Sequence, residues 1–154
     1  MATHQIPARA TSRYSGQYTN ATDPQRLIEI FSDSHRIALS SKNPDTAHER
    51  FELAVEAYHQ LMSMNVTSDV RASVHSAMSS LADQFPAQVY VNEALGLREK
   101  AAKLKTALKK LELLQRAHQV LQKGLASNPG GSASIQTAAE QVRAEIAQAQ
   151  AATT

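Results

Sequence analysis

The chain has 154 residues, of which 42% are hydrophobic and 19% charged, and its formal net charge is +2. This composition is typical of a folded soluble domain and excludes a fully disordered chain. The absence of cysteine excludes disulfides, thiolate metal sites and thiol nucleophiles, and it fits a reducing compartment, so we expect a cytoplasmic protein. The apolar runs are only a few residues long, so we expect no transmembrane segment.

The first part of the chain, residues 1–21, has no apolar region of the kind found in a secretory signal peptide. It also has no periodic apolar face that could offset the entropy lost on ordering. We therefore expect a disordered tail over residues 1–21, followed by a single helical domain over residues 22–150.

The first helix is expected over residues 24–40. Asp23 followed by Pro24 is a typical helix start, since aspartate accepts hydrogen bonds from free backbone N–H groups and proline fits the first helical position. Apolar residues recur at helical spacing from Leu27 to Leu39, and Pro44 disfavours the helical conformation of the residue before it.

The second helix is expected over residues 46–63. Thr46 and Glu49 have the spacing of a capping box, in which each side chain satisfies a free backbone N–H of the other. We expect Phe51 to be fully buried between the first two helices. The apolar stripe has helical spacing and consists of Ala47, Phe51, Ala54, Tyr58 and Leu61.

Three further helices are expected over residues 68–85, 92–127 and 133–149. The first of them ends before Pro86, and the short stretch Ala87–Asn92 resembles a β-strand in composition. The second keeps a heptad-like spacing of leucines and ends at the breaker sequence Asn128–Ser132. The expected fold class is therefore all-α, a five-helix bundle of helical hairpins with one long basic helix.

Residues 27–62 resemble two known helical modules. The segment Lys42–Met62 is similar to the loop and third helix of J-domains, although the His-Pro-Asp motif is absent because Asn43 precedes Pro44. The spacing of Ala47, Phe51 and Ala54 is similar to the second helix of a tetratricopeptide repeat. A tetratricopeptide-like resemblance implies a helical hairpin whose small residues let the two helices approach closely, whereas generic hairpin packing explains the same spacing. The resemblance therefore bears on the fold and not on the function.

Candidate catalytic and metal sites are weak. His48, Glu52, Glu56 and His59 could share one helix face, but three turns are too long for one ion to contact all four side chains. No serine lies in a nucleophile elbow and no glycine cluster forms a phosphate-binding loop. We therefore expect no enzyme activity, no catalytic or metal-binding residues and no cofactor.

The strongest charge signal lies between residues 98 and 123, where eight bases face two acids. A basic helix can meet phosphates or an acidic protein surface. This segment has no aromatic side chain to stack on bases, and lysine provides no bidentate fork. The candidate basic face consists of Arg98, Lys100, Lys103, Lys105, Lys109, Lys110 and Arg116.

The expected function is a non-catalytic helical interaction or scaffold module. A helix over residues 92–127 would extend about 54 Å, beyond a compact domain of this size. Either it breaks near Gly96 or Gln115, or one end projects and needs a partner helix. The partner would be another protein or a second copy in a homodimer. The alternative is an electrostatic nucleic-acid-binding protein that uses the basic face. The expected interaction residues are Leu104, Leu108, Leu111 and Leu114.

Overall fold

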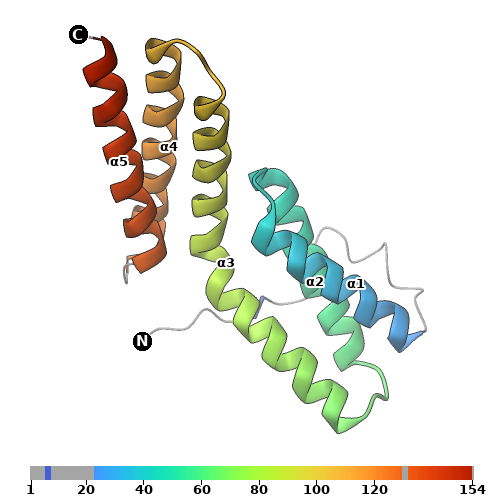
Figure 1. The fold of residues 1–154 in the computed structure, drawn as a ribbon. Helices are drawn as coiled ribbons and strands as arrows, with labels where there is room; N and C mark the ends of the chain where they lie inside the picture. Colours follow the sequence, from blue (N-terminus) through green and yellow to red (C-terminus); the bar gives the residue numbers. More distant parts are fainter. Residues whose placement is uncertain (1–5, 8–22, 130–131, 154) are drawn as a thin grey trace. The chain divides into compact units, whose positions relative to one another are not determined.

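The computed structural model describes residues 6–7, 23–129 and 132–153, and these residues form five α-helices and no β-strand. The predicted all-α fold of five helices is confirmed. The predicted disordered tail lies, apart from Ile6 and Pro7, outside the described residues. The helices are α1 (Pro24–Ser40), α2 (Pro44–Met62), α3 (Ser68–Ala102), α4 (Ala107–Ser127) and α5 (Ala133–Thr153) (Figure 1).

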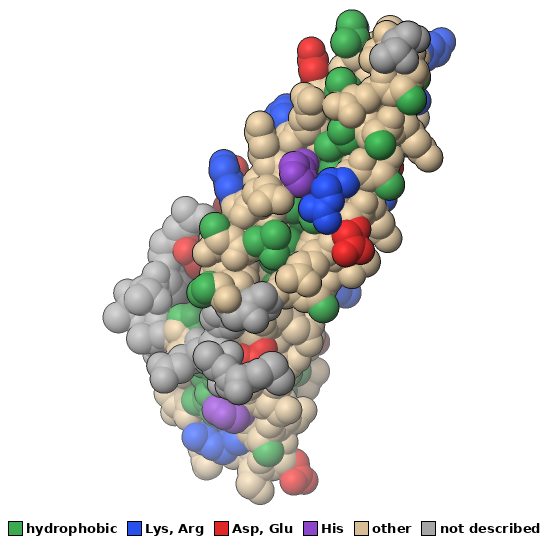
Figure 2. Space-filling model, turned by 90° about the vertical axis from the view of Figure 1, so that its left-hand side faces the viewer, with side chains coloured by type: hydrophobic (Ala, Val, Ile, Leu, Met, Phe, Trp, Pro, Cys, Tyr) green, Lys and Arg blue, Asp and Glu red, His purple; other side chains and the backbone are tan. Residues whose placement is uncertain are grey.

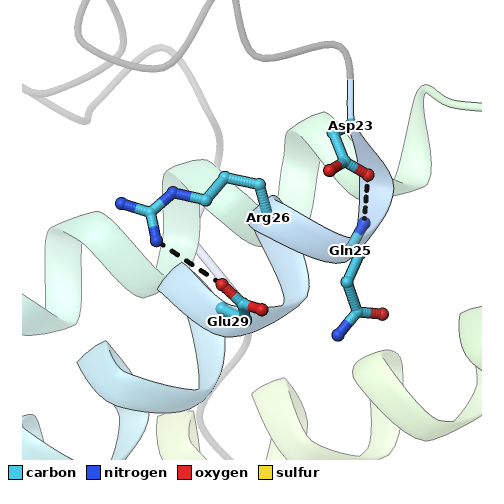
Figure 3. Close-up of polar contacts among 4 residues, drawn as sticks. All are labelled: Asp23, Gln25, Arg26 and Glu29. Atoms are coloured by element: carbon cyan, nitrogen blue, oxygen red, sulfur yellow. Dashed lines mark hydrogen bonds and ion pairs between the residues drawn. The ribbon is translucent and has the colours of Figure 1, made fainter.

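Helix α1 begins where the sequence predicts. The Asp23 carboxylate accepts a hydrogen bond of 3.0 Å from the backbone N–H of Gln25, so Asp23 is the N-cap (Figure 3). One turn further on, Arg26 and Glu29 form an exposed pair at 3.5 Å between positions three apart. Such a pair contributes only about 0.3–0.5 kcal/mol, so the cap matters more for this helix end.

Helix α2 begins at Pro44, two residues before the predicted start. Pro44 takes the first helical position, where its missing N–H costs nothing. The prediction that Thr46 caps the helix is wrong, because Thr46 is already inside it. The side chain of Ser41 instead accepts a hydrogen bond of 3.2 Å from the backbone N–H of Asn43 just before the helix.

The predicted helix end before Pro86 is wrong, because α3 continues from Ser68 to Ala102 with Pro86 in its interior. The stretch predicted to be β-like, Ala87–Asn92, is part of this helix. An interior proline costs about 3 kcal/mol, since it lacks the N–H that a helix uses. Burial of Phe85 and Val89, each 4% exposed, offsets that cost on both sides of the proline.

The predicted single helix over residues 92–127 is also wrong. Helix α3 ends at Ala102, and the N–H groups of Lys103 and Leu104 bond to carbonyls only three residues earlier, at 3.2 and 3.1 Å. Thr106 is extended, with φ −95° and ψ 137°, and α4 follows it. This break lets α4 pack along α5 rather than project into solvent (Figure 1).

The chain divides into two compact units at the Phe85–Pro86 bond within α3. Of the described residues, the first unit contains those up to Ser40 together with Asp45–Phe85. The second unit contains Ser41–Pro44 and the described residues from Pro86 onward. The single domain expected over residues 22–150 stays a prediction, because units that share a helix can fold together.

The first unit has a core of large side chains. The ring of Phe51 stacks on Phe85 with centroids 4.5 Å apart and an interplanar angle of 14°. Phe51 is only half-buried, so the prediction that it is fully buried is wrong, and Phe85 is the ring that the core encloses. The other large apolar residues buried here are Leu27, Phe31, Leu53, Val55, Tyr58, Leu61, Val74, Met78 and Leu81.

The second unit has a core of small side chains. A Cβ atom added to Gly124 of α4 would lie 2.9 Å from the Cβ of Tyr90 on α3 and 3.2 Å from the Cδ1 of Ile135 on α5. These distances show that the three helices approach one another closely. The main buried cluster consists of Ala94, Ala117, Leu121, Ile135, Ala138, Ala139 and Val142.

Asn128 ties the end of α4 to α3 inside the second unit. Its side-chain amide donates one hydrogen bond of 2.8 Å to the carbonyl of Gly124 and another of 3.1 Å to the carbonyl of Pro86. The first bond satisfies a carbonyl in the last turn of α4, where carbonyls lack helical partners.

Candidate protein-interaction surface

The register of α4 decides which of the four predicted interaction leucines can meet a partner. The buried positions of this helix are Leu114, Ala117, Leu121 and Gly124, spaced three, four and three residues apart. Leu114 is 5% exposed and belongs to a small cluster with Ala101 and Ala149. It is therefore a core residue and lies outside any surface that a partner can contact.

The other three leucines remain at least partly accessible. Leu108 lies in the first turn of α4 and is 67% exposed. Leu111 is half-buried and packs against the cluster around Leu114, and Leu104 is half-buried in the connection before α4. We call Leu104, Leu108 and Leu111 the leucine surface, with Leu108 as its most exposed member.

The predicted basic residues are distributed over the end of α3, the following connection and α4. Arg98 is paired with an acid: its Nε donates a hydrogen bond to Glu145 at 2.5 Å, and its Nη1 donates one to Gln141 at 3.2 Å. Lys110 is half-buried. The exposed residues are Lys100, Lys103, Lys105, Lys109 and Arg116.

Apart from Arg98, none of the predicted basic residues forms an ion pair with any residue that the structure describes. Two acids stand nearby in the sequence, Glu99 and Glu112. Glu99 pairs instead with Lys42 at 2.5 Å. The positive charge at this end of the second unit is therefore largely uncompensated within the described part of the chain.

The start of α4 strengthens this positive potential. The first turn contains no acid but carries Lys109 and Lys110, and the Thr106 side chain makes no capping hydrogen bond. The N-terminus of a helix has a partial positive charge, so acids stabilise it and bases destabilise it by about 0.3–1 kcal/mol each. The sequence thus places bases where the helix alone would favour acids.

Three exposed bases also lie in a row along one face of α4. Lys109 and Arg116 are seven residues apart, and Lys123 follows after another seven, so the three share one side of the helix. All three are exposed, at intervals of about 10.5 Å along the axis. Glu112 lies on the same exposed side, so the row is basic but not purely so.

One face of the molecule carries mixed charge. Figure 2 shows one side of the molecule, on which basic and acidic side chains are scattered among hydrophobic and polar ones. The coloured side chains on that side form no extended patch of a single charge.

The histidines of α2 have ordinary packing partners. His48 meets the edge of the Phe85 ring, with centroids 5.1 Å apart. The Nε2 of His59 lies 2.6 Å from the carbonyl oxygen of Pro7, and Tyr58 shares a hydrogen bond of 2.8 Å with His75. Within the described ranges, no group of three or more histidine, aspartate or glutamate residues could hold a metal ion.

One feature of the second unit, a groove of about 410 Å³ beside the start of α4, could not be predicted from the sequence. Alanines form much of its wall, and alanine has no chemistry that marks a site in advance. A second hollow of about 430 Å³ lies between α3 and the first half of α5, and the exposed Leu95 lines it.

No helix in the described part of the chain combines the length and apolar character needed to cross a bilayer. The resemblance of residues 27–62 to tetratricopeptide or J-domain hairpins stays a prediction. Comparison with protein-family models, with curated proteins and with solved structures finds no match to this chain.

Proposed function

We propose that the chain is a non-catalytic helical module that binds a partner protein through the leucine surface of Leu104, Leu108 and Leu111. The exposure of Leu108 carries this proposal. Leu108 is 67% exposed, against 36% for Leu95, the other exposed large hydrophobic residue among those described. Burying one leucine contributes about 1.5–3 kcal/mol, so a partner that covers Leu108 gains substantial affinity from it.

The surrounding charge favours an acidic partner over a second copy of the chain. Lys105 and Lys109 are exposed on either side of Leu108 in the sequence and have no ion pair with described residues. Two copies that met through Leu108 would bring these like charges together, which costs free energy at an interface. A partner segment with apolar side chains flanked by aspartate or glutamate complements both features.

Electrostatic binding of nucleic acid is the second candidate, supported by the row of Lys109, Arg116 and Lys123 on one face of α4. These residues are exposed and could neutralise phosphates. Binding of this kind would depend steeply on salt and would not need Leu108.

The test uses a labelled helical peptide built from leucine and glutamate, a matched peptide with lysine in place of glutamate, and a labelled DNA duplex. Fluorescence anisotropy should show that the acidic peptide binds and the basic peptide does not. Leu108→Asp should weaken acidic-peptide binding about tenfold or more, since removal of an apolar anchor typically costs above 1.4 kcal/mol. Ala126→Asp is the control, because Ala126 is exposed on the same helix and the charge change is identical.

Three results would contradict the proposal. Equal loss of peptide binding in both variants would show that only net charge matters. Sedimentation as a dimer that Leu108→Asp converts to monomer would show that the surface pairs with itself. Tight duplex binding that is unaffected by Leu108→Asp, together with no peptide binding, would favour the nucleic-acid function.

A further inference from the structure

The groove beside the start of α4 is formed by three helices of the second unit. Its volume is about 410 Å³, within the range of about 300–1,000 Å³ that is usual for small-molecule sites. Five alanines and Leu114 line it together with five polar or charged side chains. The lining residues with apolar side chains are Ala101, Ala102, Ala107, Leu114, Ala149 and Ala152.

Lys110 occupies an unusual position in this groove. The buried residues of α4 are spaced three or four residues apart, beginning at Leu114. Lys110 lies four residues before Leu114 and therefore on the same side of the helix. An apolar residue is expected at that position of an amphipathic helix. Lys110 is instead half-buried there and lines the groove.

The groove has an excess of positive charge. Its ionisable lining residues are Arg98, Lys105, Lys110 and Glu145. The Arg98–Glu145 ion pair compensates one positive charge, and its side chains are only 22% and 36% exposed. Lys105 and Lys110 have no ion-pair partner among the described residues, which leaves two positive charges beside an alanine wall.

The dimensions favour a small ligand over a protein segment. The lining residues of α4 run from Ala107 to Leu114 and those of α5 from Glu145 to Ala152. Seven residues of helix correspond to about 10.5 Å. A stable protein interface usually buries about 800 Å² on each partner, more than a groove two turns long provides.

We propose that this groove binds a small amphiphilic anion, in which a carboxylate or phosphate group is attached to a short apolar chain. The anionic group lies between the Nζ atoms of Lys105 and Lys110, and the apolar chain lies along Ala101, Ala149 and Ala152. The groove shares Lys105 with the charged surroundings of the leucine surface, but Leu104, Leu108 and Leu111 are not among its lining residues. The inference does not depend on the proposed protein-binding function.

The experiment titrates the full chain with octanoate, octyl phosphate, inorganic phosphate and octyltrimethylammonium by isothermal calorimetry and amide chemical shifts. Octanoate and octyl phosphate should bind at millimolar concentrations and shift the amides of residues 98–114 and 145–152. Inorganic phosphate lacks the chain and octyltrimethylammonium carries the opposite charge, so both should bind at least about tenfold more weakly.

A matched pair of variants distinguishes binding in the groove from a general effect of the protein's positive charge. Lys110→Met removes the charge within the groove and restores an apolar residue to the buried stripe, so the fold should remain intact. Lys109→Met removes the same charge from a neighbouring exposed residue outside the groove. Octanoate affinity should fall about tenfold in Lys110→Met and change little in Lys109→Met, because the contact to an ionised group is lost only in the first.

A second variant, Ala152→Leu, leaves every charge in place and fills part of the groove from an exposed position. It should also weaken octanoate binding while inorganic phosphate binding is unchanged. The proposal is overturned if the wild-type protein does not bind octanoate, or if octyltrimethylammonium or inorganic phosphate binds as tightly as octanoate. It is also overturned if Lys109→Met and Lys110→Met lose octanoate affinity equally.

Discussion

Replacing Gly124 with alanine should destabilise the protein, even though alanine is the better helix former by about 1 kcal/mol. The added Cβ would lie 2.9 Å from both Cβ and Cγ of Tyr90 and 3.2 Å from Cδ1 of Ile135. The Cβ of Tyr90 is bonded to the backbone of α3, so no rotamer change moves it away, and the clash needs a movement of that helix. Overpacking of this kind costs about 1–3 kcal/mol, and with a clash in the upper part of that range the net loss is about 1–2 kcal/mol.

Urea denaturation followed by circular dichroism measures this loss. With a slope of about 2 kcal/mol per molar urea, the midpoint should fall by about 0.5–1 M. Ala126→Gly serves as the control, because Ala126 is exposed on the same helix and reports helix propensity alone, with an expected loss of about 1 kcal/mol. If Gly124→Ala raises the midpoint while Ala126→Gly lowers it, propensity outweighs packing and the close approach of the three helices is refuted.

Two further substitutions test the first unit. Phe85→Ala should lower the free energy of unfolding by about 3–5 kcal/mol in urea denaturation, because Phe85 is 4% exposed and stacks on Phe51. Phe51→Ala should lower it clearly less, because that ring is only half-buried, and equal losses would contradict this difference. Asp23→Ala should lower stability by about 1 kcal/mol through loss of the N-cap hydrogen bond to Gln25, and Asp23→Asn, which keeps an acceptor, should lose much less in the same assay.

Local chemistry predicted the start of α1 and the approximate bounds of α1, α2 and α5 from the sequence. Asp23 and Pro24 act through neighbours a few residues away, so their effect can be read without tertiary structure. Pro86 misled the prediction because its cost of about 3 kcal/mol is smaller than the gain from burying the apolar residues around it. Local sequence signals report only helix propensity, and at Pro86 the free energy gained by tertiary packing is larger than the propensity cost.

The position of the break between α3 and α4 could not be predicted, since residues 103–106 contain neither glycine nor proline. The position of this break also determines which of the predicted interaction leucines are exposed. Leu108 and Leu114 look equivalent in a continuous heptad-like pattern, but the position of the turn leaves Leu108 exposed and buries Leu114. The basic residues were predicted as a group because charge is visible in the sequence, whereas the groove depends on alanines that give no such signal.

The alanine-rich core of the second unit has a consequence for how stability changes with temperature. In the cluster around Leu121, four of the seven buried residues are alanine, so this core encloses little apolar surface for each residue that it orders. The heat capacity change of unfolding grows with the apolar surface that becomes exposed. The second unit should therefore contribute less to this heat capacity change, residue for residue, than the first unit with its phenylalanine, leucine and methionine core. Its free energy of unfolding should follow a flatter curve, with weaker loss of stability on cooling.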